Sequence, residues 1–415
     1  MSSVVNKIPT LAALQYRNYR IYWLGLLVAI LGWQMLTFAQ LWLVYELTNS
    51  TFYLGLAGGV NGVSNTAFSA LGGVYADRLD KRRLLILTSS GLAVLSFALA
   101  TLTATGLVNV WYVLALTALT GAVSAFDTPA RQALLPHLID DVKDLNNAVA
   151  LASSVWSATR VIGPALAGAL IALSSPAICF YITSFAYGIM VISLTRISLS
   201  WKFSPDNHRG LLSEFAEGWR FVLGNTVFLT LITMTFLNSI FGMSFIYLLP
   251  AFTKVVLAVG PSGYGFLMAA YGIGGVCGVI TVASIGHHAP RGRLLITGCS
   301  LFSMLLVAFA LSKSYAISLA LIGLMGFFSS LYMTNVLTTL QAMVPDNLRG
   351  RVMGIYGLTW SLLPLGGMQA GFVATIVGTA RAIIIGGLVI LGFTVLVALF
   401  SRSVRNLAHH VPSSR

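Results

Sequence analysis

The sequence predicts an all-α membrane protein with twelve transmembrane helices, and three observations lead to this fold class. Hydrophobic residues make up 57% of the 415-residue chain and charged residues only 8%, roughly a third of the charge that a water-soluble surface carries. Apolar runs recur along the whole chain, and about 20 such residues cross a hydrocarbon core of about 30 Å. Lipid requires each run to satisfy its own backbone hydrogen bonds, so the spans are helices; they are too long and too uniformly apolar for barrel strands.

The apolar runs form two sets of six. The expected spans are residues 21–44, 52–75, 84–105, 108–134, 146–173 and 177–195, followed by 227–255, 263–285, 293–311, 315–343, 352–377 and 382–401.

A polar interruption separates the two sets. Its second part, LLSEFAEGWRFV, has apolar residues at helical spacing against Glu214, Glu217 and Arg220, which predicts an amphipathic surface helix. We therefore expect an N-terminal six-helix bundle over residues 1–195, a cytoplasmic linker over 196–225, and a C-terminal six-helix bundle with a short tail over 226–415.

Internal repeats indicate that the two bundles are pseudo-symmetric. The segment QALLP at 132–136 resembles QAMVP at 341–345, 209 positions later, and RRLLI at 82–86 resembles GRLLI at 292–296. Duplicated halves of this kind place a central site between two bundles that can rock about it.

The net charge of +13 reflects membrane topology rather than nucleic-acid binding, because the basic residues are sorted by loop. With an even number of spans and the amino terminus inside, all but four of the 24 basic residues fall on one side. The exceptions are Lys254, Lys313 and Arg381, which fall opposite, and Arg160, which lies within a span. The positive-inside rule then puts both termini in the cytoplasm.

The stretch GVYADRLDKRR after the second span resembles the cytoplasmic helix 2 to helix 3 motif of the major facilitator superfamily. The matching residues are Gly73, Asp77, Arg78, Lys81 and Arg82, with Asp80 in place of the second glycine. The resemblance implies a conformational latch that also includes Asp127 and holds the outward-open state, with Arg78 and Lys81 linking Asp77 to Asp127. Alternatively, these charges only fix the topology.

Further stretches resemble one branch of that superfamily, the enterobactin exporters and drug:proton antiporters. They are WLVYELTNS, FDTPARQALLPHL, RVIGPALAGAL, GPSGYGFLMAAYGIGG and VPDNLRGRVMGIYGL, and Gly163, Pro164, Ala167 and Gly168 approximate the antiporter motif of helix 5. The resemblance implies a monomeric, proton-coupled exporter of small amphipathic molecules in a prokaryotic inner membrane. The arginine usual in span 4 of proton antiporters has no counterpart at Gly121 to Val123, so export is better supported than proton coupling.

Three ionisable residues inside the expected spans are functional candidates, because such groups are expensive in lipid. Glu46 is the only acid expected on the outer half, which makes it a candidate for proton coupling or a helix-end residue bonded to Thr48 or Asn49. Asp127 is a second coupling candidate, although Arg131 four residues on also predicts a local ion pair. Arg160, near the midplane, either pairs with Asp127 or serves as counter-charge for an anionic substrate or a coupling carboxylate.

Other polar and aromatic residues in the spans are candidates for a substrate cavity. They are Gln34, Asn61, Asn65, Asn238, Asn335, Trp156, Trp360 and Gln369. Hydrogen bonds between helices would explain the polar members equally well.

The sequence contains no enzyme, cofactor or metal motif. A phosphate-binding loop with its lysine is missing, and the paired histidines have a poor spacing for metal ligands. Energy would therefore come from a gradient or from a partner protein. The alternatives are a lysolipid or metabolite carrier of the same fold, a non-transporting receptor or scaffold, and a channel.

Overall fold

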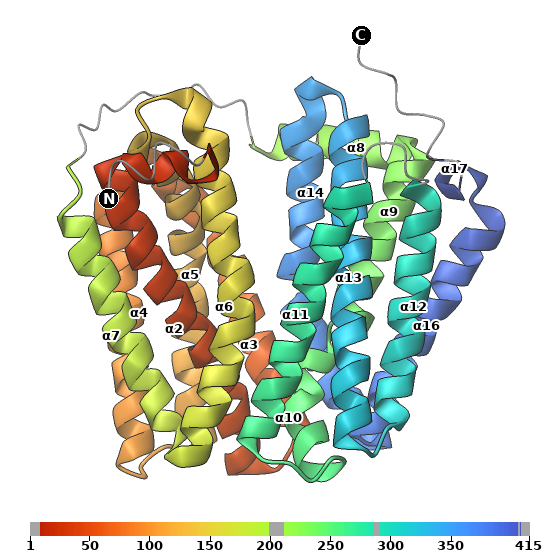
Figure 1. The fold of residues 1–415 in the computed structure, drawn as a ribbon, viewed down its shortest axis with the longest axis horizontal. Helices are drawn as coiled ribbons and strands as arrows, with labels where there is room; N and C mark the ends of the chain where they lie inside the picture. Colours follow the sequence, from red (N-terminus) through yellow and green to blue (C-terminus); the bar gives the residue numbers. More distant parts are fainter. Residues whose placement is uncertain (1–8, 199–210, 286–290, 406, 408–415) are drawn as a thin grey trace. The chain divides into compact units, whose positions relative to one another are not determined.

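The computed structural model describes residues 9–198, 211–285, 291–405 and 407 and contains helices and no strands within that part (Figure 1). Eleven helical segments in it are long and apolar enough to cross a membrane. The 28-residue helix α3 (Thr51–Arg78) makes twelve long segments in the same described ranges. The predicted all-α, twelve-span fold class is confirmed.

The chain divides into two compact units. The first comprises residues up to Asn49, Val60–Pro205 and Gly260–Ala269, and the second comprises Ser50–Gly59, Asp206–Val259 and Ala270–Arg415. Helix α3 and helix α11 (Pro261–Ile285) are therefore each shared between the units. The first unit also contains η1 (Pro9–Gln15), α2 (Arg17–Thr48), α4 (Lys81–Ala104), α5 (Val110–Leu134), η2 (Leu135–Leu138), η3 (Val142–Asp144), α6 (Leu145–Leu173) and α7 (Pro176–Thr195).

In the first unit, α2 and α6 run side by side in a constant register. The Tyr19 hydroxyl donates to the carbonyl of Ala148 at 2.7 Å, and the Trp23 indole donates to that of Leu151 at 3.1 Å. Further along, Gln34 packs on Gly163, so the offset between the helices stays at 128 or 129 residues. The two helices are therefore parallel, and a residue of α6 lies at about the same depth as the α2 residue 128 or 129 positions earlier.

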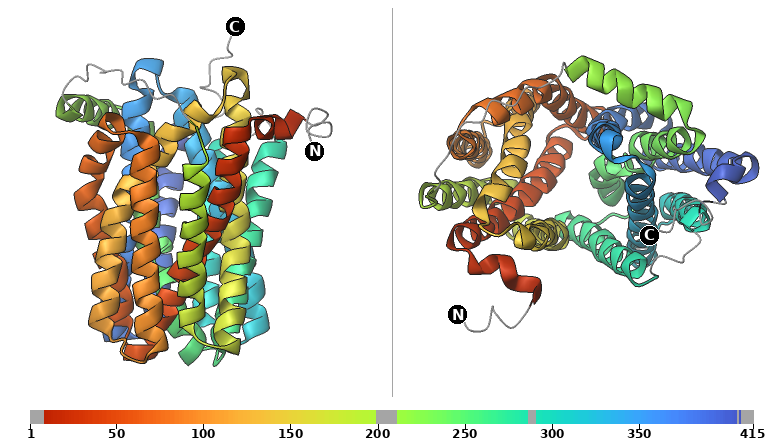
Figure 2. Two further views of the ribbon diagram at one scale, coloured as in Figure 1. Left: turned by 90° about the vertical axis from the view of Figure 1, so that its left-hand side faces the viewer. Right: turned by 90° about the horizontal axis from the view of Figure 1, so that it is seen from above.

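The short helix η1 closes the end at which α2 and α6 begin, which we call the η1 end of the first unit. It lies across the start of α2 (Figure 2). The Ala13 amide donates to the Asn147 side chain at 2.9 Å, while Gln15 and Tyr16 each donate to Asp144 at 2.9 Å. These bonds fasten the start of α2 to the start of α6.

The second unit holds the remaining elements. They are α8 (Leu211–Gly224), α9 (Thr226–Leu237), the π-helical segment η4 (Asn238–Gly242), α10 (Phe245–Val255), α12 (Arg291–Leu311), α13 (Tyr315–Met343), η5 (Asp346–Leu348), α14 (Arg349–Ser361), α15 (Leu363–Val377), α16 (Thr379–Phe400) and α17 (Arg402–Arg405). The expected amphipathic helix is α8, and the polar stretch before it, with Pro205, lies outside the described residues.

Two of the expected single spans are interrupted. Span 227–255 contains the π-helical segment, in which the Met243 amide bonds the Asn238 carbonyl five residues back at 2.8 Å. Span 352–377 breaks at Leu362, because Pro364 lies in the first turn of the next helix and has no amide hydrogen to continue the previous one. Hydropathy alone does not reveal either break, since the residues on both sides are apolar.

Candidate functional site

Asp127 and Arg131 form a buried ion pair within α5. Both residues are nearly inaccessible, at 7% and 8% exposure. The Arg131 Nε donates to Asp127 Oδ2, Arg131 Nη2 donates to Asp127 Oδ1 at 3.3 Å, and the Thr88 hydroxyl of α4 donates to the same Oδ1 at 2.8 Å. The structure thus shows the local pair that the i, i+4 spacing indicates, with Thr88 as a partner that the sequence did not reveal.

The alternative in which Arg160 pairs with Asp127 is wrong. Asp127 precedes the end of α5 by 7 residues and Arg160 follows the start of α6 by 15. At 1.5 Å per residue these are depths of roughly 10 and 22 Å from the η1 end, so about 12 Å of axial distance separates the two groups.

Arg160 lies on a defined face of α6. Trp156, Arg160, Gly163 and Ala167 follow one another at helical spacing, and we call them the Arg160 stripe. Trp156 and Arg160 are exposed, whereas Gly163 and Ala167 are buried. Ile162 and Leu173, both apolar and exposed, lie on the side of the helix away from Arg160. These two apolar side chains suit lipid, whereas the exposed Arg160 suits a polar environment.

Arg160 has no hydrogen-bond or ion-pair partner among the described residues. Gln34 of α2 is half-buried and likewise makes no side-chain hydrogen bond there. Its Cβ would lie 2.5 Å from a Cβ built on Gly163, three residues along the stripe from Arg160. An unpaired guanidinium and an unpaired amide therefore occur on neighbouring turns of the same surface.

The helix 5 motif serves close packing. A Cβ on Gly168 would lie 2.6 Å from the Pro261 carbonyl oxygen, and one on Gly265 would lie 2.6 Å from that of Pro164. The start of α11 thus meets α6 backbone to backbone. Ala167 is completely buried, so the alanine that replaces the motif's glycine is accommodated.

Glu46 lies in the last turn of α2, exposed and without a hydrogen-bond partner among the described residues. The Thr48 hydroxyl donates to the Val44 carbonyl at 2.7 Å, and Asn49 ends the helix in the left-handed conformation at φ 48°. The expected alternative, a carboxylate fixed by these helix-end residues, is not what the structure shows.

The described part of the latch motif differs from expectation. Asp77 lies in α3, but its side chain is outside the described residues, as is any contact it makes. Asp127 is paired with Arg131, not with Arg78 or Lys81. Gly73 has nothing within 4 Å of a built Cβ, whereas a Cβ on the neighbouring Gly72 would overlap the Ala125 carbonyl oxygen of α5. The close approach of α3 and α5 therefore depends on Gly72, which the motif does not single out.

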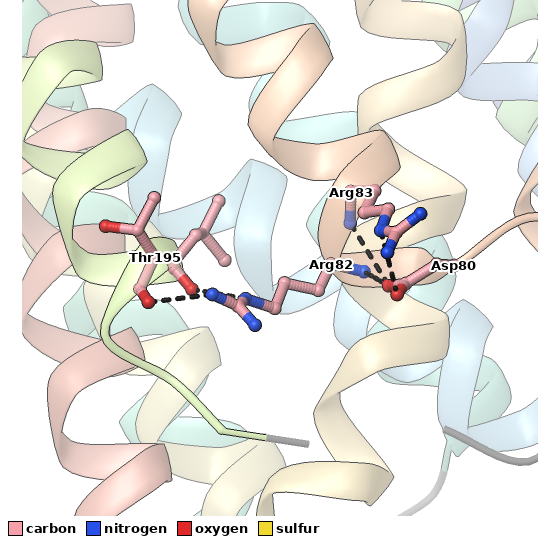
Figure 3. Close-up of polar contacts among 5 residues, drawn as sticks. Asp80, Arg82, Arg83 and Thr195 are labelled. Atoms are coloured by element: carbon pink, nitrogen blue, oxygen red, sulfur yellow. Dashed lines mark hydrogen bonds and ion pairs between the residues drawn. The ribbon is translucent and has the colours of Figure 1, made fainter. Parts of the chain in front are cut away.

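Arg82 and Asp80 have structural partners that the motif did not predict (Figure 3). Asp80 caps α4 by accepting from the amides of Arg82 and Arg83 at 2.9 and 3.1 Å, which explains an aspartate at this position. The Arg82 guanidinium reaches α7 and donates to the Leu194 and Thr195 carbonyls, each at 2.7 Å. A cation at a helix carboxyl end is favoured by the helix dipole, so Arg82 ties α4 to the end of α7.

The other cavity candidates have varied surroundings. In the first unit, Asn65 donates to the Gly121 carbonyl at 3.3 Å and Asn61 is half-buried. In the second, Asn335 bonds within its own helix to Leu331 at 2.8 Å, which fits the hydrogen-bonding alternative. Asn238 is fully buried in the π-helical segment with both amide atoms unpartnered. Trp360 is exposed and Gln369 half-buried.

An ion pair joins the linker helix α8 to α14 inside the second unit. Arg351 Nη1 lies 2.7 Å from Glu217 Oε2, and a Cβ on Gly218 would lie 3.1 Å from the Arg351 Cβ. Glu217 was expected only as part of the polar face of α8. The sequence gives no signal for this pair, because its members are 134 residues apart.

A family model described as transmembrane secretion effector, one of the major facilitator models, matches residues 8–414. Similar proteins include a staphyloferrin A transporter of Staphylococcus aureus, 26% identical over 88% of this chain and 91% of that protein. The enterobactin exporter EntS of Shigella flexneri is 25% identical over 95% of both chains. The multidrug efflux pump Tap of Mycolicibacterium fortuitum is 24% identical over 81% of this chain and 84% of that protein.

Solved structures share the fold. A bacterial homologue of the human lysosomal transporter Spinster, inward-facing and unoccupied, matches with a TM-score of 0.72 and 13% identity over 95% of this chain and 97% of that one. The nucleoside transporter NupG matches with a TM-score of 0.71 and 13% identity over 93% and 99%. Since the family model spans nearly the whole chain, this protein belongs to the transmembrane secretion effector family of the major facilitator superfamily.

Proposed function

We propose that the protein is a secondary active exporter that moves small amphipathic molecules of the drug or siderophore type in exchange for protons by alternating access. The observation that carries this proposal is Arg160, an exposed and unpaired cation far from either end of α6, on the face opposite to the apolar one. A charge at this depth is expensive unless it serves a transport path. Relatives named as siderophore and multidrug exporters support export as the direction.

Glu46 and Asp127 have different roles in this proposal. Asp127 is buried and held by Arg131 and by Thr88 of the neighbouring helix α4, which suits a structural role. Glu46 is exposed and without a partner among the described residues, so it can exchange protons with its surroundings. Glu46 is therefore the proton-coupling residue, and the Asp127 pair fixes the shape of the bundle.

The protein lies in the inner membrane of a prokaryote as a monomer, with both termini in the cytoplasm. The excess of basic residues on one side supports this orientation. The η1 end is then the cytoplasmic end, and Glu46 lies at the outer end of α2. Asp77, Arg78 and Lys81 lie on the cytoplasmic side, where they form a latch whose loss shifts the populations of the transport states, while Arg82 fastens α4 to α7.

The test is accumulation in everted membrane vesicles with an imposed pH gradient, measured for a panel of fluorescent drugs. We expect uphill accumulation that an uncoupler collapses and that vesicles without the protein do not show. A channel or receptor would give no accumulation above the outside concentration. That result across the panel would contradict the proposal.

A further inference from the structure

The surface formed by Arg160, Gln34 and Trp156 has the chemistry of an anion site. Arg160 contributes five donors in a planar fork, and Gln34 contributes an amide donor one turn further along the paired helices. Trp156, four residues before Arg160 on the stripe, is 42% exposed and contributes an indole face. Each of the two polar groups lacks a partner among the described residues, so their hydrogen-bonding capacity is available to a ligand.

No described acid of the spans supplies the missing counter-charge. Asp127 is paired with Arg131 and lies about 12 Å nearer the η1 end by the axial estimate above. Glu46 follows Gln34 by 12 residues of α2, roughly 18 Å. Both carboxylates are therefore out of reach of the Arg160 guanidinium in this conformation.

We propose that Arg160, Gln34 and Trp156 form a recognition site for a carboxylate carried on an aromatic group, and that the transporter recognises its substrates by this aromatic carboxylate. The inference rests on the proposed export function. A guanidinium binds a carboxylate through two parallel hydrogen bonds, which gives geometric selectivity as well as attraction. The indole face suits a flat ring attached to that carboxylate.

The charge balance favours a carboxylate over a phosphate. Arg160 is the one unpaired base of this surface, and Gln34 is neutral, so the site carries a single positive charge. The other arginine inside a span of the first unit's described part, Arg131, is neutralised by Asp127. A monoanion matches this charge, whereas a phosphate close to two negative charges would remain partly uncompensated.

Two xanthene dyes test the site: one with a free aromatic carboxylate and its methyl ester, which differ in that group alone. Binding to the purified full-length protein is followed by fluorescence polarisation. We expect the acid to bind at least about tenfold more tightly than the ester, a difference of about 1.4 kcal/mol, because only the acid forms charged hydrogen bonds with the guanidinium. Arg160→Gln should remove this preference and leave ester binding unchanged.

Variants keep the test decisive. Arg160→Lys retains the positive charge without the planar guanidinium and should give an intermediate preference for the acid over the ester. It replaces Arg160→Gln in the test if that variant does not fold. Arg381→Gln, at an exposed arginine at the start of α16, is the matched control and should bind like the wild type.

Equal wild-type affinity for acid and ester, including no binding of either, would overturn the carboxylate site. An equal change of both affinities in the Arg160 variants would do the same. The proposed export function is judged separately, by pH-driven accumulation of the drug panel, so either proposal can fail without the other's readout changing.

Discussion

Asp127→Asn in α5 is expected to destabilise the protein by about 3–5 kcal/mol, the cost of leaving the buried Arg131 charge without its partner. The substitution is nearly isosteric, so the loss is electrostatic. The structure supports the upper part of this range, because Arg131 is 8% exposed and its Nη1 already has no hydrogen bond. Arg131→Met should cost a similar amount, since Asp127 would keep only Thr88.

The double variant Asp127→Asn with Arg131→Met should be far less destabilised than the sum of the single variants, with a coupling energy of at least about 2 kcal/mol. The assay is reversible unfolding of the purified protein in mixed detergent micelles, followed by circular dichroism. The control is the same cycle on Asp346 and Arg349, an exposed pair at 2.6 Å, for which we expect a coupling below about 1 kcal/mol. Additive effects at Asp127 and Arg131 would refute the buried-pair account.

Three further predictions concern packing, coupling and the linker. Gly72→Ala should lower the yield of folded protein by overlap with the α5 backbone, a cost of about 1–3 kcal/mol, while Gly73→Ala should match the wild type in size-exclusion chromatography. Glu46→Gln should abolish pH-driven accumulation in vesicles and leave dye affinity unchanged; full accumulation would remove Glu46 from the mechanism. Glu217→Arg should slow transport and the swap Glu217→Arg with Arg351→Glu should restore it, whereas no recovery would show that the α8–α14 ion pair does not matter for the cycle.

The fold could be predicted from the sequence because lipid imposes simple requirements. A run of apolar residues of spanning length must be a helix, and the described helices begin and end within a few residues of the expected spans. The breaks at Asn238–Gly242 and at Leu362 could not be read this way. They depend on local backbone hydrogen bonding, which mean hydropathy does not measure.

The candidate site was predictable only where its partners are close in sequence. Asp127 and Arg131 are four residues apart on one helix, so their pairing follows from helical spacing. Thr88 reaches Asp127 from another helix, and Arg82 reaches the end of α7 across 112 residues, so both contacts depend on tertiary packing. Similarly, the motif pointed to Gly73, but the close contact falls on Gly72 because the crossing of α3 and α5 decides which neighbour faces inward.

The central claim is that the protein exchanges drug for protons. The most direct test is whether an added drug drives protons out of liposomes that contain the protein. The purified protein is reconstituted in liposomes that contain a pH-sensitive dye and have an acidic interior, and a transported drug is added outside. We predict that the drug accelerates the loss of internal protons as it enters, and that Glu46→Gln prevents this acceleration. Drug entry with no change in the rate of proton loss would contradict the account.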